Sequence, residues 1–185
     1  MISDTTTCYL DGLNANIITV EAEILRGISA FYIVGLASAS IQESKERIRV
    51  ALNSAGYSMP MGRIVINLVP ANVHKIGTHF DLPIAISLLS VMGKVKSDVV
   101  SKFAFLGELS LDGSLRPVDG CIAMICALKE KNITNVILPK QNAKEASIID
   151  GMNIYPAVNL MHVVKMLRGE TEMSEYKENC GHQKY

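Results

Sequence analysis

The chain has 185 residues, and its 18 basic residues balance its 18 acidic residues. Hydrophobic residues make up 49% of the chain and charged residues 19%, which is typical of one folded domain and excludes a disordered polymer. Because there is no net positive charge, the domain alone is a poor candidate for tight nucleic-acid binding, although a local basic patch is still possible.

The cysteines and apolar runs indicate a cytoplasmic protein. The four cysteines form no C-x-x-C pair: Cys8, Cys121, Cys126 and Cys180. Without a signal-peptide pattern, this favours free and mostly buried thiols in a reducing compartment. The longest apolar runs, 82–92 and 121–128, are too short to cross a bilayer, so no membrane role is expected.

The first third of the chain predicts two strands followed by a helix. Residues 17–25 alternate as a strand does, and Asn14 and Asn16 are expected to form the turn before it. A second strand over 30–36 is expected to pair with it as a hairpin through residues 26–29. A helix then begins at Ser38 or Ser40 and stops at Gly56.

The outer face of that helix carries a run of charges that allows two interpretations. Glu43 and Arg47 are four residues apart and predict an ion pair. A solvated helix face is the first interpretation. The second is a DNA-contacting patch made of Lys45, Arg47 and Arg49.

The middle of the chain predicts a buried strand, a loop and a buried helix. Residues 63–70 are almost continuously apolar, which predicts burial on both faces of the sheet. The loop that follows contains Lys75, Gly77 and Thr78, and leads into a helix over 82–92. We expect Asp81 to cap this helix, with Pro83 in its first turn.

The second half alternates between strands and helices. Residues 103–111 and 114–118 predict a hairpin around Asp112-Gly113. Beyond it we expect a helix to residue 131, strands over 135–139 and 153–156, and helices over 142–149 and 159–168. This order predicts a layered α/β domain over residues 1–168. The polar residues 169–185 predict a tail or linker.

The loop before the 82–92 helix is the candidate site. Unpaired backbone N–H groups at a helix N-terminus could bind an anion or activate a nucleophile, with Thr78, His79 and Asp81 as candidates. The alternative is that Asp81 only caps the helix. His74, His79 and Asp81 lack regular ligand spacing, and Cys180 with His182 has no partner cluster, so no metal is expected.

Several ordered motifs over residues 8–168 resemble the N-terminal domain of the ComM/YifB family, also labelled magnesium-chelatase-like. They are Gly35-Leu36, Gln42-Glu43-Ser44-Lys45-Glu46-Arg47-Ile48-Arg49, Asn67-Leu68-Val69-Pro70-Ala71, Phe80-Asp81-Leu82-Pro83-Ile84-Ala85 and Gly107-Glu108-Leu109-Ser110-Leu111-Asp112-Gly113. The resemblance implies an α/β (α+β) fold of the ribosomal protein S5 domain 2-like type, shared with the Lon proteolytic domain.

The same resemblance implies the partners. In the family this domain precedes an AAA+ ATPase module, and ComM proteins are thought to act as hexameric DNA branch-migration helicases in natural transformation. The chain contains no G-x-x-x-x-G-K-[ST] phosphate loop. ATP and magnesium are therefore expected only in the ATPase module, and DNA contact only in an assembled homo-hexamer.

The kinship with Lon raises the question of a Ser/Lys peptidase. Beside the Lon pattern, His79 falls at the nucleophile position and Ile122 at the lysine position, so both halves of the dyad are missing. A one-residue shift would make Thr78 the nucleophile. Lys129, however, lies roughly 10 Å further along the helix than Ile122, at about 1.5 Å per residue. The expected function is a non-catalytic domain, and the alternatives are a Lon-like Ser/Thr peptidase and an S5-type RNA-binding module.

Overall fold

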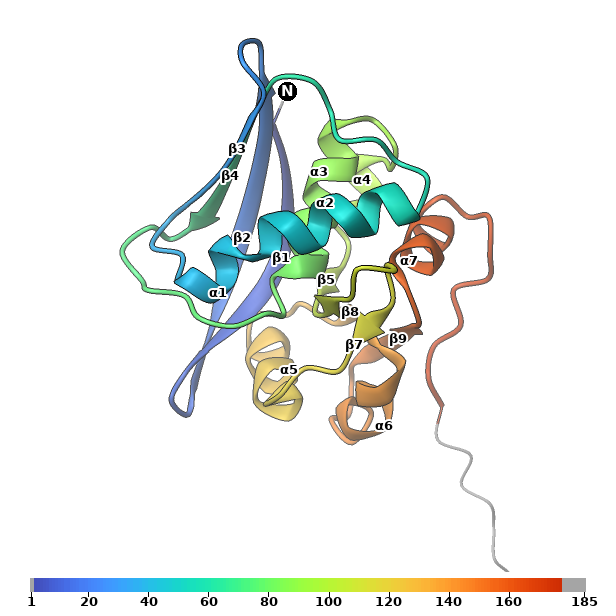
Figure 1. Ribbon diagram of the computed structural model, residues 1–185. Helices are drawn as coiled ribbons and strands as arrows, with labels where there is room; N and C mark the ends of the chain where they lie inside the picture. Colours follow the sequence, from blue (N-terminus) through green and yellow to red (C-terminus); the bar gives the residue numbers. More distant parts are fainter. Residues whose placement is uncertain (1, 178–185) are drawn as a thin grey trace, which may run out of the picture.

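A computed structural model describes residues 2–177 and shows a seven-stranded mixed sheet in the order β3-β4-β2-β1-β5-β8-β9 (Figure 1). The strands are β1 (Ile2–Asp11), β2 (Asn14–Leu25), β3 (Ala30–Val34), β4 (Arg63–Val69), β5 (Ala104–Phe105), β8 (Asn135–Pro139) and β9 (Asn153–Ala157). A separate pair consists of β6 (Glu108–Leu109) and β7 (Leu115–Arg116). The helices are α1 (Ala39–Gln42), α2 (Ser44–Ser54), α3 (Asp81–Val91), α4 (Ser97–Val100), α5 (Cys121–Glu130), α6 (Ala143–Ala146) and α7 (Leu160–Leu167), with the 3-10 helix η1 (Lys140–Asn142).

The first hairpin corrects the sequence prediction at its N-terminal end. β1 is a full strand that pairs antiparallel with β2, with Asp11 opposite Asn14. Asn14 and Asn16 therefore lie in β2, and the turn is made by residues 12–13. The sequence pattern did not predict this strand, because hydroxyl side chains lie on its buried side where apolar ones are expected. Those of Thr5 and Thr7 donate to the carbonyls of Pro83 and Phe105, at 2.9 and 2.8 Å.

The expected hairpin between the second and third strands is wrong. β4 lies between β2 and β3, antiparallel to the first and parallel to the second. Two parallel neighbours need a crossover, and α1 and α2 provide it. β4 is also not buried on both faces, because buried and half-buried residues alternate along it. The predicted helix over 38–56 exists, but it is divided at Glu43.

The second half follows the prediction closely. β5, β8 and β9 pair in parallel, and β5 also pairs in parallel with β1, which joins the two halves of the sheet. The Asp112-Gly113 hairpin is confirmed as the short β6–β7 pair. Residues 104–105 belong to the main sheet instead, so the predicted strand over 103–111 is two separate pieces.

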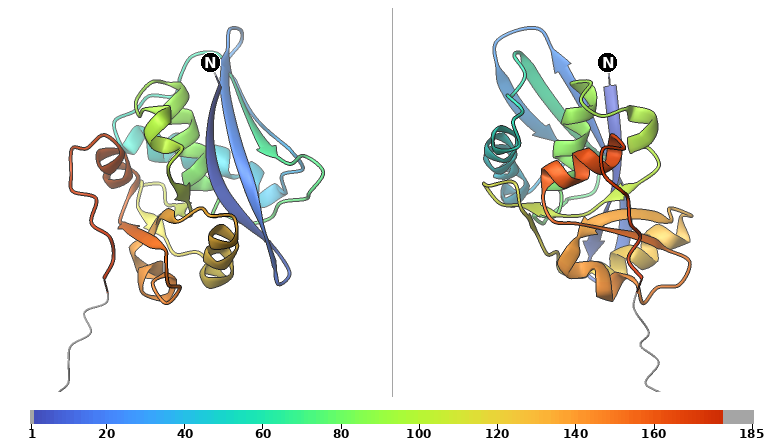
Figure 2. Two further views of the ribbon diagram at one scale, coloured as in Figure 1. Left: turned by 180° about the vertical axis from the view of Figure 1, so that it is seen from behind. Right: turned by 90° about the vertical axis from the view of Figure 1, so that its right-hand side faces the viewer.

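Two apolar clusters hold the layers together. The larger cluster includes the buried faces of α2, α3 and α7, and the smaller one includes those of α5 and α6, on the other side of the sheet (Figure 2). α3 lies at the centre, with residues 81–90 all buried. Among residues 2–177, no helix combines the length and apolar character that crossing a bilayer requires.

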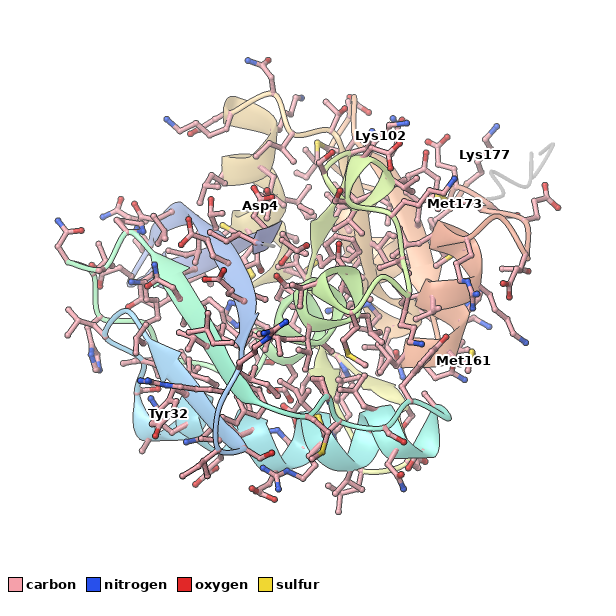
Figure 3. The ribbon with its side chains drawn as sticks, turned by 90° about the horizontal axis from the view of Figure 1, so that it is seen from above. Asp4, Tyr32, Lys102, Met161, Met173 and Lys177 are labelled. Carbon is pink, nitrogen blue, oxygen red and sulfur yellow. The ribbon has the colours of Figure 1, made fainter. Side chains whose placement is uncertain are left out.

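The polar C-terminal segment packs on both apolar clusters through side chains of the described residues 169–177. The backbone N–H of Tyr176 donates to the carbonyl of Ile154 in β9 at 2.7 Å, and its half-buried ring packs on the smaller cluster. Half-buried Met173 packs on the larger cluster. Figure 3 shows Met173 and Lys177 on one side of the molecule and Tyr32, on the edge strand β3, on the other.

Candidate functional site

A cavity of about 240 Å³ opens where the loop before α3 faces the start of α5. The loop, β1, β6 and the segment leading into α5 contribute its walls. The lining residues are Leu10, Ile76, Gly77, Thr78, His79, Glu108, Pro117, Val118, Asp119 and Met124. Two of the three sequence candidates, Thr78 and His79, therefore share one cavity, whereas Asp81 does not line it.

Thr78 is paired with an acid that the sequence analysis did not single out. Its hydroxyl donates to Glu108 Oε2 at 2.5 Å, and the other carboxylate oxygen of Glu108 lies 3.8 Å from Arg116 Nε. The hydrogen bond fixes the position of the Thr78 hydroxyl against the Glu108 carboxylate.

His79 is buried, with 7% of its surface exposed. Its Nε2 lies 2.7 Å from the carbonyl oxygen of Cys8, and a carbonyl only accepts, so Nε2 carries the hydrogen. The ring packs beside Phe80, with centroids 4.5 Å apart. Burial lowers the pKa of His79 to about 4, against the opposing effect of the Cys8 hydrogen bond. His79 is therefore a neutral imidazole at pH 7.

Asp81 is not the helix cap that its position predicts. It is the first residue of α3, the cap position belongs to Phe80, and no side chain caps the helix. Instead Asp81 is fully buried and accepts from Arg47 Nε at 2.7 Å, from the Ser44 hydroxyl at 2.5 Å and from the Leu109 N–H at 3.1 Å. The carboxylate joins α2, α3 and β6. Burial raises its pKa, and these partners oppose that rise.

Lys75, grouped with the capping loop by sequence, has a different role. Its side chain is fully buried, and its ammonium donates to the carbonyls of Gly35 at 2.7 Å, Leu68 at 3.1 Å and Pro70. Three donors meet three acceptors, so the charge is fully hydrogen-bonded. Burial lowers the pKa of Lys75. The lysine thereby ties the loop to the ends of β3 and β4.

The Ser/Lys dyad is not assembled in the part of the chain that the structure describes. His79 offers no hydroxyl, and Ile122 is 41% exposed on α5 and does not line the cavity. The lining residues include no lysine. A Ser/Lys dyad needs a lysine within hydrogen-bond reach of its nucleophile, and the residues that line this cavity supply none.

The predicted basic patch on α2 needs one correction. The Arg47 guanidinium turns inward to Asp81, and only 20% of its side chain is exposed, so it does not share the outer face. The Glu43–Arg47 pair exists, at 3.8 Å. Lys45 is half-buried and Arg49 is exposed, with its guanidinium 4.0 Å from Glu46. Lys45 and Arg49 remain the candidates for DNA contact.

The remaining candidates form no metal site among residues 2–177, where no cluster of three ligand side chains occurs. His74 is exposed in its loop. Cys8, Cys121 and Cys126 are free thiols, the first two buried, as predicted. Burial raises the pKa of Cys8 to about 11 and that of Cys121 to about 12, which makes both unreactive at pH 7. Cys180 and His182 lie outside the described residues.

Comparison with known proteins then decides the family. The model described as subunit ChlI of Mg-chelatase matches residues 20–142, which is more than half of the chain. The chain belongs to this ChlI family. The ChlI-like region is shared with ComM and YifB proteins, as the motifs predicted: the competence protein ComM of Haemophilus influenzae is 38% identical over 162 residues.

A second relative, YifB, matches the chain over a similar range. YifB of Escherichia coli is 35% identical over 167 residues, covering 90% of this chain and 33% of YifB. The ComM match covers 88% of this chain and 32% of ComM, so the chain spans about a third of the length of these relatives. The similarity to Lon is distant: Lon protease of Karelsulcia muelleri is 26% identical over 170 residues, which is 20% of that protein.

Proposed function

We propose that this chain is a non-catalytic domain of a ComM/YifB-type AAA+ protein that acts in ring assembly or DNA contact. The observation that carries the proposal is the ComM match, which covers nearly all of this chain and a third of the relative. ATP and magnesium would then bind to the AAA+ module, because residues 1–185 contain no phosphate-loop motif. The assembled protein would be a homo-hexamer that acts on branched DNA in recombination and natural transformation.

The Lon similarity and the parallel second half of the sheet support a Lon-like, S5 domain 2-like fold for this domain. They also make a Lon-like peptidase the alternative function. The cavity argues against it, since its hydroxyl is paired with Glu108 and its lining supplies no lysine. A zero formal charge likewise weighs against the S5-type RNA binder.

DNA contact is proposed for Lys45 and Arg49. They are four residues apart on α2 and therefore lie on the same side of the helix. A single domain would neutralise few phosphates and bind no better than about 10⁻⁴–10⁻⁶ M. A ring would repeat the pair around its axis and raise the local concentration of positive charge without any new contact.

The test is charge reversal in a protein that joins this domain to its AAA+ module. Lys45→Glu with Arg49→Glu should weaken binding to branched DNA and reduce the slope of log K against log salt by about 0.9 per lost phosphate contact. The matched control is Lys140→Glu with Lys144→Glu, which reverses two exposed lysines that are also four apart. Binding by the control should be unchanged.

If both double variants bind DNA with equal affinity, the proposed DNA contact is wrong and the charges of α2 form only a solvated helix face. The proposal of a non-catalytic domain fails on a different result. Cleavage of unfolded casein by the domain, abolished by Thr78→Ala, would establish the peptidase alternative instead.

A further inference from the structure

The two edges of the seven-stranded sheet differ in how the chain covers them. β9 forms one edge and β3 the other. The Ile154 carbonyl in β9 points away from β8, because the neighbouring Asn153 N–H donates to the Thr134 carbonyl on the β8 side at 2.8 Å. That outward carbonyl accepts from the Tyr176 N–H at 2.7 Å, so the C-terminal segment lies against the β9 edge. No described strand pairs with the outer edge of β3.

The outer edge of β3 carries unpaired backbone groups. The Ala30 N–H donates to the Gly62 carbonyl at 3.2 Å, so Ala30 and every second residue after it face β4. The N–H and C=O groups of Phe31 and Ile33 therefore point away from β4. The Gln42 side-chain amide donates to the Ile33 carbonyl at 2.9 Å, and no other hydrogen bond in the described part of the chain reaches these four groups. Two N–H groups and one carbonyl are thus open to another extended backbone.

β3 lacks the features that usually protect an exposed edge. Edge strands commonly carry charged residues or proline, which oppose pairing with a further strand. The β3 sequence, Ala-Phe-Tyr-Ile-Val, contains neither. Phe31 and Ile33 pack in the larger apolar cluster, whereas Tyr32 and Val34 on the opposite face are each 46% exposed. Figure 3 shows Tyr32 at the periphery of the molecule, where a partner strand could cover it.

A cavity of about 200 Å³ lies at the start of β3. The first residues of β3, the loop before β4 and α2 contribute its walls. Its larger apolar lining side chains are Phe31, Met59, Pro60, Met61 and Ile64, and its charged lining residue is Arg49. The side chains of an added strand alternate between the two faces of the sheet. One of them can therefore enter this cavity while its neighbours lie beside Tyr32 and Val34.

The start of β3 is also positively charged. Arg63 lies opposite Ala30 in the pairing of β3 with β4, and its guanidinium lies over the Tyr32 ring, 4.9 Å from the ring centroid. No described carboxylate forms an ion pair with Arg63. Arg49 in the cavity lies 4.0 Å from Glu46. A carboxylate on a partner strand would be attracted to this end of β3.

A second copy of the chain does not supply that carboxylate. In an antiparallel pairing of two β3 strands, the start of one lies beside the end of the other, and residues 34–36 carry no acid. A parallel pairing would bring the arginines of the two copies together. β3 has five residues and is therefore ~17 Å long. That length fits a linear segment better than a folded surface, whose standard interface buries about 800 Å² on each side.

We propose that the outer edge of β3 binds an extended segment of another polypeptide chain as an added strand. The backbone of this segment pairs with Phe31 and Ile33, one apolar side chain enters the cavity, and an acidic residue lies beside Arg63. This binding goes beyond the proposed role in a ring or in DNA contact and does not depend on it, because the β3 edge is part of the domain itself.

The experiment titrates the 185-residue chain with an acetylated and amidated peptide that alternates valine and threonine over five residues and carries an aspartate at each end. NMR follows the backbone amides. We expect saturable shifts at residues 29–34 and 59–63. The Phe31 and Ile33 amide hydrogens should exchange rapidly in the free chain and become protected by the peptide. Those of Tyr32 and Val34 should be protected throughout, because they face β4.

Two altered peptides separate the backbone contribution from the charge. A peptide N-methylated at every residue keeps its side chains but has no backbone donor, so it should cause no saturable shift. Replacing both aspartates with asparagine should weaken binding about twofold to fivefold, as expected for a solvent-exposed ion pair.

Two variants of the chain test the same charge from the other side. Arg63→Gln should weaken binding of the aspartate peptide by a similar factor. Arg116→Gln, which changes an exposed arginine of β7, is its matched control and should bind as the unchanged chain does.

Three results would overturn the proposal: equally tight binding of the N-methylated peptide, equal affinities of the two arginine variants, or Phe31 and Ile33 amides that stay unprotected at saturation. Protection of these two amides without peptide, rising with the concentration of the chain, would also overturn it, because a second copy would then occupy the edge.

Discussion

Asp81 lies where the local sequence pattern predicts a helix cap, but in the folded chain its carboxylate has a different role. Sequence placed it at a helix start, where aspartate commonly caps. Tertiary structure uses the carboxylate to join three elements through Ser44, Arg47 and the Leu109 N–H. A buried pair of this kind adds little net stability over an apolar replacement, but removing one partner leaves the other charge unmatched.

We therefore expect Asp81→Ala, Asp81→Asn and Asp81→Ser to destabilise the domain similarly, by about 2–4 kcal/mol. Asparagine and serine are good caps, so a capping role would be rescued by both. Urea unfolding at pH 7 measures the loss. Asp98→Asn is the matched control, because Asp98 is also in a first helical turn but is exposed, and it should change stability by less than about 0.5 kcal/mol.

The hydrogen-bond partners of Asp81 and Thr78 could not be predicted from the sequence. Ser44 and Glu108 are 37 and 30 residues from Asp81 and Thr78 in sequence, and no spacing rule connects them. The position of the candidate loop was predictable, because a glycine-containing polar loop before an apolar run signals a helix start. The direction of each side chain depended on long-range packing that periodicity does not encode.

His79 should make stability depend on pH. Its pKa falls from an ordinary value of 6.5 to about 4 in the folded chain, so between these values the unfolded chain binds a proton that the folded chain does not. Stability therefore rises with pH across this window, and at pH 5 the deficit relative to pH 7 is about 2 kcal/mol. Asp81 acts oppositely, because its raised pKa favours the folded chain as pH falls.

Comparison of the unchanged chain with His79→Gln separates the contribution of His79 to the pH dependence of stability from that of Asp81. Chemical unfolding at pH 7 and pH 5 should show a smaller loss in the variant than in the unchanged chain. The exposed His74→Gln is the control and should keep the full loss. An identical pH response in the His79 variant would mean that His79 is protonated in the folded chain as readily as in the unfolded chain.

Among the elements of the N-terminal half of the sheet, β2, β3 and β4 were predicted as strands, β1 was not, and the expected pairing of β2 with β3 was wrong. Adjacent strands usually pair, and four residues separate the ends of β2 and β3. The error arises because β4, which begins 29 residues after β3 ends (Val34 to Arg63), lies between them. The second half was predicted well because alternating strands and helices allow few arrangements.

Gly35, directly after β3, lies close against the backbone of Leu68 in β4. Its φ is +98°, and an added Cβ would lie 2.2 Å from the Leu68 carbonyl oxygen. Gly35→Ala should therefore cost about 2–4 kcal/mol, through a left-handed backbone and a clash with backbone atoms. Gly56→Ala is the control: its φ is +83°, but open space surrounds it, so only the backbone term of about 1–2 kcal/mol applies. Thermal unfolding of both variants should rank them in this order.

For the whole molecule, the described C-terminal segment lies against both apolar clusters. Composition predicted a tail or linker from residue 169, because most of its side chains are polar. Within the described residues 169–177, the two apolar side chains are Met173 and Tyr176, and both are half-buried, one on each cluster. The segment thus contacts both sides of the sheet. The average composition of the segment did not predict these contacts, because they depend on two individual side chains.

These contacts should contribute measurably to stability. Burying about half of each side chain predicts that Met173→Ala with Tyr176→Ala costs about 1–3 kcal/mol in the free energy of unfolding. Glu172→Ala with Glu175→Ala is the matched control, since both glutamates are exposed and their removal leaves the clusters covered. Ending the chain after Arg168 should cost at least as much as the apolar pair. If that shortened chain unfolds at the same urea concentration as the full chain, the domain ends at residue 168 and the segment is a linker without a structural role.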